Sequence, residues 1–232
     1  MSTAILFDLD GTLVDTPAGM TTVLRAVVTE HGRTATDDQL RRTVGRPLTA
    51  SLATLLGLPV DDPEVGRAAD RARRLFTELV IPSAARLVLP GVPELLAALR
   101  DRGHPLAVVT SKVRPSAIEL LAATGLLDAF DSLSCHGMAE RGKPHADLAL
   151  LAADALGVSP ARCIVVGDAV DDVRMANAAG MTPFGVTTGV ASRAELLLAG
   201  ARAVFTGADT LGPALLLSDS DPRPARPQPE VI

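Results

Sequence analysis

The feature that most constrains the fold of this chain is a regular alternation of short apolar segments with helical segments. The segment Cys163-Ile164-Val165-Val166 is apolar at every position, which is typical of a strand covered by helices on both faces. Such strands, alternating with helices, predict a Rossmann-like α/β fold, an open parallel sheet with helices on both sides. The predicted strands are residues 105–110, 131–134, 162–167, 181–187 and 203–206, and the predicted helices are residues 92–102, 114–124, 145–156, 170–179, 193–199 and 210–217.

The N-terminal segment adds one more predicted strand, which ends on two carboxylates. Residues 4–7 form an apolar run too short for a helix, and Asp8 and Asp10 follow it. Because alternate residues of a strand point the same way, we expect both side chains to enter one cleft at the edge of the sheet. Two carboxylates this close repel each other by about 1 kcal/mol in water and by about 4 kcal/mol at an effective dielectric constant near 20. A pair kept at this cost indicates metal binding or acid/base chemistry.

A stretch of about seventy residues after the first strand is predicted to form a small α-helical bundle. Apolar residues recur in it at helical spacing, and an Asp-Pro-Glu segment at 62–64 opens its longest helix. Four arginines of that helix, between residues 67 and 74, are predicted to form a solvated face. The predicted parts of the chain are residues 1–15 and 85–217 for an α/β core domain, residues 16–84 for the helical bundle and residues 218–232 for a disordered tail.

The composition argues against several classes of partner. The net charge is −5 without a basic cluster, and five phenylalanines stand beside no tyrosine or tryptophan, so no nucleic-acid partner is expected. No apolar run reaches membrane-spanning length and no basic segment precedes the N-terminal apolar run, so no membrane contact and a cytoplasmic location are expected. Cys135 and Cys163 lack zinc-type spacing. Lys112 and Lys143 are the only lysines of the chain, and nothing in the sequence indicates an oligomeric state.

Polar side chains follow several of the predicted strands, at the edge where open α/β sheets place their chemistry. Thr110 and Ser111 follow one strand, and their hydroxyls can bind a phosphate oxygen, although such residues are also ordinary helix caps. Lys143 lies just before a predicted helix. Asp168 ends another strand, and Asp172, four residues on, can share its face. Acidic residues also stabilise helix N-termini, but three carboxylates within residues 168–172 exceed what capping requires.

Taken in this order, the segments resemble the four motifs of the haloacid dehalogenase (HAD) superfamily of phosphotransferases, in its phosphatase form. The resemblance covers roughly residues 3–217, and the helical bundle resembles the C1 cap of that superfamily. Phosphoglycolate phosphatases are the branch that looks most similar. Ala169 departs from a frequent Ser or Thr, and Ala146 from a frequent Pro. The segments that carry the resemblance are Asp8 to Thr16, Val108 to Lys112, Gly142 to Pro144, Gly167 to Asp172, and Thr187 to Gly189.

The resemblance also implies roles for individual residues. Asp8 would be the nucleophile that forms an aspartyl-phosphate, and Asp10 the general acid and base. Thr110, Ser111 and Lys143 would hold the phosphoryl oxygens.

A metal site follows from the same resemblance and from the balance of charges. The implied ligands are the Asp8 carboxylate, the Asp10 backbone carbonyl and Asp168, with Asp172 as a further ligand or as support. Four carboxylates and a phosphate dianion face only the one positive charge of Lys143, so a divalent cation is expected. An all-oxygen ligand set suits Mg²⁺.

The implied activity is that of a phosphatase: a phosphomonoesterase acting on a small phosphorylated metabolite, such as phosphoglycolate or a sugar phosphate. A β-phosphoglucomutase-like phosphomutase stays open as an alternative, although an alignment on Gly45 places Leu48 where those enzymes carry an arginine. A pyrophosphatase also stays open. A non-catalytic binding domain is the least favoured, because every catalytic position is filled.

Arg46 is the candidate substrate contact in the cap. It lies in the loop 44–48 between two predicted helices, where related enzymes turn residues toward the core. A guanidinium there can pair bidentately with a carboxylate or another anionic group on the substrate. The alternative is a solvated loop residue, and the sequence favours neither.

Overall fold

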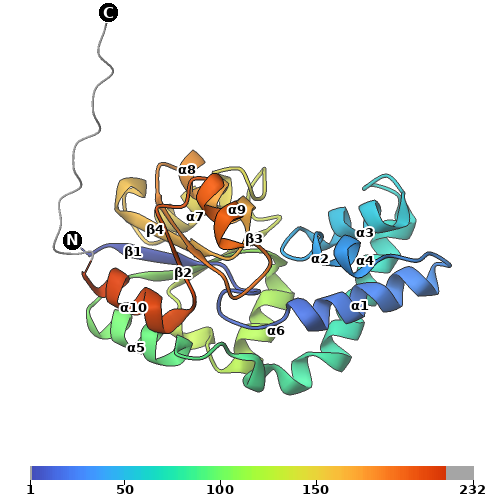
Figure 1. The fold of residues 1–232 in the computed structure, drawn as a ribbon, viewed down its shortest axis with the longest axis horizontal. Helices are drawn as coiled ribbons and strands as arrows, with labels where there is room; N and C mark the ends of the chain where they lie inside the picture. Colours follow the sequence, from blue (N-terminus) through green and yellow to red (C-terminus); the bar gives the residue numbers. More distant parts are fainter. Residues whose placement is uncertain (1, 218–232) are drawn as a thin grey trace, which may run out of the picture.

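The computed structural model describes residues 2–217, and its centre is a six-stranded sheet (Figure 1). The strands are β1 (Ala4–Phe7), β2 (Leu106–Val113), β3 (Ser132–His136), β4 (Cys163–Gly167), β5 (Thr182–Val186) and β6 (Ala203–Phe205). Their spatial order is β3-β2-β1-β4-β5-β6, and all neighbours are parallel, so the predicted open parallel sheet is confirmed. The order reverses between β1 and β4, which is where doubly wound sheets bind ligands. The predicted tail, residues 218–232, lies outside the described residues.

Helices cover both faces of the sheet. They are α5 (Val92–Asp101), α6 (Arg114–Thr124), α7 (Asp147–Ala155), α8 (Val170–Ala178), α9 (Arg193–Leu198) and α10 (Ala208–Leu217), with short 3₁₀ helices η2 (Leu127–Ala129) and η3 (Pro160–Arg162). Figure 1 shows α7, α8 and α9 on one side of the sheet and α5, α6 and α10 on the other. Ala4 and Leu6 of β1 pack in the layer with α7 and α8, and Ile5 and Phe7 in the opposite layer. Because β1 is apolar on both faces, both helix layers can close over it.

Four helices between β1 and the rest of the core form a bundle beside the sheet (Figure 1). They are α1 (Pro17–Glu30), α2 (Asp37–Arg41), α3 (Leu48–Leu56) and α4 (Pro63–Leu79), and the 3₁₀ helix η1 (Ile81–Leu87) leads back to the core. The Asp62 carboxylate caps α4 by accepting a hydrogen bond from the Glu64 N–H at 2.8 Å. Helix α4 buries its apolar face, which includes Ala72 and Phe76, in the bundle. The boundary proposed at residue 84 falls within η1.

Strand β2 continues three residues beyond its predicted end at Thr110. Its pairing with β3 shifts register between Thr110 and Val113. The apolar run ends at Val109, but backbone pairing with β3 needs no apolar side chain, so the strand continues past it. Thr110 and Ser111 therefore lie in an irregular strand end and not in a loop before a helix. An irregularity of this kind re-aims the side chains around it.

The other predicted strands and helices of the core begin and end within two residues of the observed ones. Helix α7 starts at Asp147 and not at His145, because the Asp147 carboxylate accepts a hydrogen bond from the Arg141 N–H at 3.2 Å and closes a turn ahead of the helix. Within residues 2–217, none of the helices has the length and apolar character needed to cross a membrane.

Candidate active site

Three buried carboxylates meet at the carboxyl ends of β1 and β4, beside the point where the strand order reverses. Asp8 follows β1, and its N–H donates to the Val166 carbonyl at 2.8 Å, which keeps the two strand ends together. Asp168 follows β4, and Asp172 lies in the first turn of α8. One oxygen of each carboxylate lies within 4.8 Å of the others, and the three residues are at most 7% exposed. The group therefore has the spacing and the donor atoms to bind a metal ion.

Lys143 joins this carboxylate cluster from the segment between β3 and α7. Its Nζ lies 2.5 Å from Asp8 Oδ1 and 2.6 Å from Asp172 Oδ1, and its side chain is 3% exposed. The lysine supplies one positive charge against three carboxylates. When all four groups are ionised, two negative charges stay uncompensated in a buried site, which a divalent cation would balance.

The electrostatics of the cluster follow from its burial. Burial raises the pKa of Asp8 well above its usual value; Lys143 opposes this shift and the neighbouring carboxylates add to it. Burial and the charge of Asp172 raise the pKa of Asp168 to about 7. Burial lowers the pKa of Lys143, but the charges of Asp172 and Asp8 outweigh it, so that pKa lies above its ordinary value. Lys143 is therefore charged, and the carboxylates retain a strong demand for further positive charge.

Asp168 is held in place by loops from two different strands. Its Oδ1 accepts a hydrogen bond from Thr12 Oγ1 at 3.0 Å, and its Oδ2 accepts one from the Val190 N–H at 2.9 Å. A Cβ on Gly189 would lie 1.8 Å from Asp168 Oδ2, and one on Gly11 would lie 2.6 Å from the same atom. The absence of these two side chains is what lets both loops close around the carboxylate.

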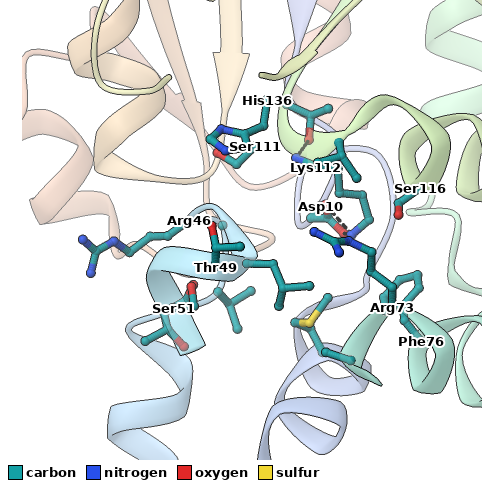
Figure 2. Close-up of a pocket in the computed structure, with 18 of the residues that line it drawn as sticks. Asp10, Arg46, Thr49, Ser51, Arg73, Phe76, Ser111, Lys112, Ser116 and His136 are labelled. Carbon is teal, nitrogen blue, oxygen red and sulfur yellow. Dashed lines mark hydrogen bonds and ion pairs between the residues drawn. The ribbon is translucent and has the colours of Figure 1, made fainter. Parts of the chain in front are cut away.

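A cavity of about 270 Å³ separates the helical bundle from this edge of the sheet (Figure 2). Asp8 and Asp10 both line it, together with Thr110 and Ser111. The expectation that the two carboxylates enter one cleft therefore agrees with the structure. The bundle contributes both apolar and polar side chains to the wall; the apolar ones are Met20, Leu24, Val44, Leu48, Ala72 and Phe76.

Asp10 faces this cavity from outside the carboxylate cluster, and it is paired with the second lysine. Lys112 Nζ lies 2.7 Å from Asp10 Oδ1 and 2.9 Å from Oδ2. The Thr16 hydroxyl also donates to Asp10 Oδ1. The same Lys112 Nζ lies 4.4 Å from the centre of the Phe76 ring. Figure 2 shows Lys112 between Asp10 and Phe76.

The family model for haloacid dehalogenase-like hydrolases matches residues 3–180. The chain belongs to the haloacid dehalogenase-like hydrolase family. The family model thereby confirms the resemblance that the four motifs carry.

The relatives of this HAD-family chain include named phosphatases. It is 41% identical to the probable phosphatase IndB of Dickeya dadantii over 84% of this chain and 86% of that protein. It is 33% identical to the N-acetylmuramic acid 6-phosphate phosphatase of Pseudomonas aeruginosa over 80% and 82% of the two chains. It is 30% identical to the phosphoglycolate phosphatase of Escherichia coli O157:H7 over 94% of each. These relatives confirm the prediction of an enzyme of the phosphatase type.

A similar solved structure carries a different activity in its name. The β-phosphoglucomutase of Clostridium difficile superposes with a TM-score of 0.81 at 25% identity and covers 91% of this chain and 93% of its own. The fold of the HAD-family chain is therefore shared with phosphomutases as well as with phosphatases, so a functional assignment has to rest on the site.

The candidate residues differ in how they meet the cavity. Thr110 is buried, and its Oγ1 accepts a hydrogen bond from the Lys112 N–H at 3.2 Å. Ser111 faces the cavity near His136 (Figure 2). Arg46 lies at the rim and is exposed, and in Figure 2 its guanidinium points away from Asp10.

Two residues that bring a lysine or arginine side chain to the cavity, Lys112 and Arg73, were not among the candidates from the sequence. Lys112 carried a signal, as one of only two lysines in the chain. Arg73 carried none, since it was grouped with the solvated arginines of α4. It lines the cavity, and its Nη1 lies 2.6 Å from Asp70 Oδ1 on the same helix. The turn of α4 that buries Ala72 and Phe76 also carries Arg73 to the cavity.

Proposed function

We propose that this chain is a Mg²⁺-dependent phosphomonoesterase that acts on a small phosphorylated metabolite through an aspartyl-phosphate on Asp8. The observation that carries the proposal is the division between the two carboxylates of the first motif. Asp8 belongs to the carboxylate cluster with Lys143, whereas Asp10 stands outside the cluster and faces the same cavity. This division supports assigning the attack on phosphorus to Asp8 and the proton exchange with the leaving group to Asp10.

The reaction proceeds in two steps. A carboxylate oxygen of Asp8 attacks phosphorus, the ester P–O bond breaks, and the protonated Asp10 gives its proton to the leaving oxygen. The Asp10 carboxylate then takes a proton from a water molecule, which attacks the phosphorus of the aspartyl-phosphate. Cleavage of the P–O bond to Asp8 releases inorganic phosphate and restores both carboxylates to their starting states.

The transferring phosphoryl group needs positive charge and hydrogen-bond donors around its oxygens. Thr110, Ser111 and Lys143 are proposed to supply these on the protein side. The carboxylates of Asp8 and Asp168 and the backbone carbonyl of Asp10 would hold Mg²⁺, whose charge would let an anionic nucleophile approach an anionic phosphate. Asp172 is proposed as a further ligand or as support for the site, in which one of its oxygens is bonded to Lys143 at 2.6 Å.

The helical bundle is proposed to be a C1 cap over residues 16–84, on a core made of residues 1–15 and 85–217. Its position supports this, because the cavity is lined by the bundle on one side and by the ends of β1 and β2 on the other. In this arrangement the leaving group of the substrate occupies the cavity and contacts the cap.

The substrate proposed from the cavity is a sugar phosphate or another ester with a leaving group of similar size. The cavity volume of about 270 Å³ approaches the ~300 Å³ of ordinary small-ligand pockets. A cavity of this volume is larger than a two-carbon glycolate group would fill. The names of two relatives, a phosphoglycolate phosphatase and an N-acetylmuramic acid 6-phosphate phosphatase, both describe substrates that carry a carboxylate besides the phosphate. Arg73 and Arg46 are the cavity cations suited to bind such a group.

The proposed activity is tested by phosphate release from a panel of phosphomonoesters with Mg²⁺. We expect turnover of about 1–10³ s⁻¹ on the best sugar phosphate and slow turnover of p-nitrophenyl phosphate. A phosphomutase would instead convert β-glucose 1-phosphate to glucose 6-phosphate and require a bisphosphate activator. Release confined to pyrophosphate, or no release from any compound, would also contradict the proposal.

Substitution of the two cavity arginines should separate substrate recognition from chemistry. Because Arg73 faces the cavity, Arg73→Met is expected to raise KM by roughly ten- to hundredfold for a substrate with a second anionic group, which corresponds to about 1.4–3 kcal/mol. Arg46→Met, at the rim, should raise KM by at most roughly tenfold. Neither change should raise KM for p-nitrophenyl phosphate, because this ester lacks a second anionic group. Equal losses on both substrates would show that neither arginine binds the second anion.

A further inference from the structure

The chain has two lysines, and each of them forms an ion pair with a different carboxylate of the first motif. Lys143 is bonded to Asp8 in the carboxylate cluster, whereas Lys112 is bonded to both oxygens of Asp10. The side chains of Lys112 and Asp10 are only 11% and 13% exposed. The second pair is therefore a largely enclosed contact inside the proposed active site, next to the place where the leaving group would lie.

The contact restricts how Asp10 can be oriented. The terminal torsion of an aspartate is broad and roughly two-fold, so an unpaired carboxylate samples many directions. An ammonium group within 2.9 Å of both oxygens holds the plane of the carboxylate with strong charge-assisted hydrogen bonds. When Asp10 is protonated, one oxygen carries the proton and the other can still accept from Lys112, which keeps the plane of the group within hydrogen-bond reach of the ester oxygen.

The backbone of Lys112 is itself held by the irregular end of β2. Its N–H donates to Thr110 Oγ1 at 3.2 Å, within the stretch where the register of β2 against β3 shifts. The shift places Thr110, Ser111 and Lys112 together on the wall of the cavity. The direction of Lys112 is thus set by the same strand end that carries the proposed phosphate-binding hydroxyls.

Lys112 also connects the core to the helical bundle. Its Nζ lies 4.4 Å from the centre of the Phe76 ring, on α4 (Figure 2). A cation at this distance from an aromatic ring is attracted to its face. Lys112 therefore contacts both the proposed general acid and the bundle, so its position depends on the bundle being seated against the core.

We propose that Lys112 is a positioning residue for Asp10, which directs the carboxylate at the leaving oxygen and makes this direction depend on Phe76 in the bundle. The proposal rests on the proposed function, in which Asp10 is the general acid. If the ion pair were purely structural, its loss would lower kcat/KM for all substrates alike. A positioning role affects mainly the substrates whose leaving group needs a proton.

The test compares two esters of similar shape, p-nitrophenyl phosphate and benzyl phosphate, by kcat/KM. The p-nitrophenolate ion leaves without a proton, whereas the benzyl alkoxide is strongly basic and needs one. For Lys112→Met we expect a loss of roughly 10²-fold on benzyl phosphate and of less than about threefold on p-nitrophenyl phosphate. Equal losses on both esters, or no loss on either, would overturn the proposal.

Three further variants make the comparison specific. Lys112→Arg keeps the positive charge and offers a guanidinium fork to the carboxylate, so it should recover much of the kcat/KM for benzyl phosphate. Phe76→Leu keeps an apolar side chain but removes the ring. It should also lose more kcat/KM on benzyl phosphate than on p-nitrophenyl phosphate, and the loss should be smaller than for Lys112→Met. Arg114→Met removes a positive charge two residues from Lys112 at an exposed position outside the cavity, and should behave as the wild type. If Phe76→Leu lowers kcat/KM equally for both esters, the position of Asp10 does not depend on Phe76 of the bundle.

Asp10→Asn separates failure of this inference from failure of the proposed function. As the variant that lacks the acid itself, it should show the steepest dependence on the leaving group, with a loss of roughly 10²–10⁴-fold on benzyl phosphate. Equal losses on both esters in Asp10→Asn would reject Asp10 as the general acid, and with it the proposed mechanism. A steep dependence in Asp10→Asn, together with none in Lys112→Met, would reject only the role of Lys112.

Discussion

Asp8→Asn is expected to abolish phosphate release, with a loss of at least roughly 10⁴-fold in kcat. The amide oxygen is a poor nucleophile and cannot form a stable acyl phosphate. The substitution also removes the negative charge of one of the two carboxylates bonded to Lys143, whose Nζ lies 2.5 Å from Asp8 Oδ1 and 2.6 Å from Asp172 Oδ1. Because a carboxylate and an amide have nearly the same shape, the fold should persist, and circular dichroism should match that of the wild type.

Asp171→Asn is the matched control for this variant. Asp171 lies in the same acidic run as Asp172 but is not part of the carboxylate cluster, and we expect turnover near the wild-type value. Acid-quenched reactions with ³²P-labelled substrate should show label on wild-type protein and none on Asp8→Asn. Substantial turnover by purified Asp8→Asn would rule out the aspartyl-phosphate mechanism.

Removal of divalent metal is the second change with a large expected effect. With EDTA, phosphate release should fall to background, and Mg²⁺ should restore it. Ca²⁺ should inhibit, because its larger and looser coordination would misplace the nucleophile and the phosphate. Full activity after exhaustive dialysis against EDTA would contradict a metal-dependent reaction.

The carboxylates of the proposed metal site should also make the stability of the metal-free protein depend on pH. The pKa values of Asp8 and Asp168 are raised in the folded protein, the latter to about 7, so the folded state holds protons that the unfolded chain has released. Stability in EDTA should therefore fall as the pH rises from about 4, the usual value for aspartate, through the folded pKa. We expect Tm to be several degrees lower at pH 7.5 than at pH 5.5, since each pKa unit corresponds to about 1.4 kcal/mol.

Metal binding should reverse this trend, because it requires ionised carboxylates. The rise in Tm on adding Mg²⁺ should be larger at pH 7.5 than at pH 5.5. Asp168→Asn should weaken the pH dependence in EDTA and reduce the rise with Mg²⁺, and scanning calorimetry measures both. A rise that does not depend on pH, or that survives unchanged in Asp168→Asn, would place the metal elsewhere.

Much of the architecture could be predicted from local patterns. The apolar runs of β1 and β4, without polar alternation, indicated strands buried on both faces, and the sheet is parallel and covered by helices on both sides. The positions of Asp8 and Asp168 at strand ends were visible as breaks in those runs. Since parallel strands bring their carboxyl ends to one edge, residues 160 positions apart in sequence could be expected to meet without knowledge of side-chain contacts.

The extent of β2 and the neighbours of Asp168 depended on tertiary structure. Backbone pairing with β3 carried β2 past Thr110, although the apolar pattern had ended. The enclosure of Asp168 by Gly11 and Gly189 requires the loops after β1 and β5 to approach each other. Neither contact leaves a periodic trace in the sequence, because both join segments far apart in the chain.

The directions of the cavity residues were also decided only by the packing of the bundle against the core. The sequence indicated Arg46 as the candidate substrate contact and Arg73 as part of a solvated helix face, yet the Arg46 guanidinium points away from Asp10 and Arg73 lines the cavity (Figure 2). Lys112 was notable only as one of two lysines, and its partners Asp10 and Phe76 come from the loop after β1 and from α4. Hydrophobic periodicity records which face of an element is buried. The partner of a long charged side chain depends on which other element packs beside it, and that is a property of the assembled fold.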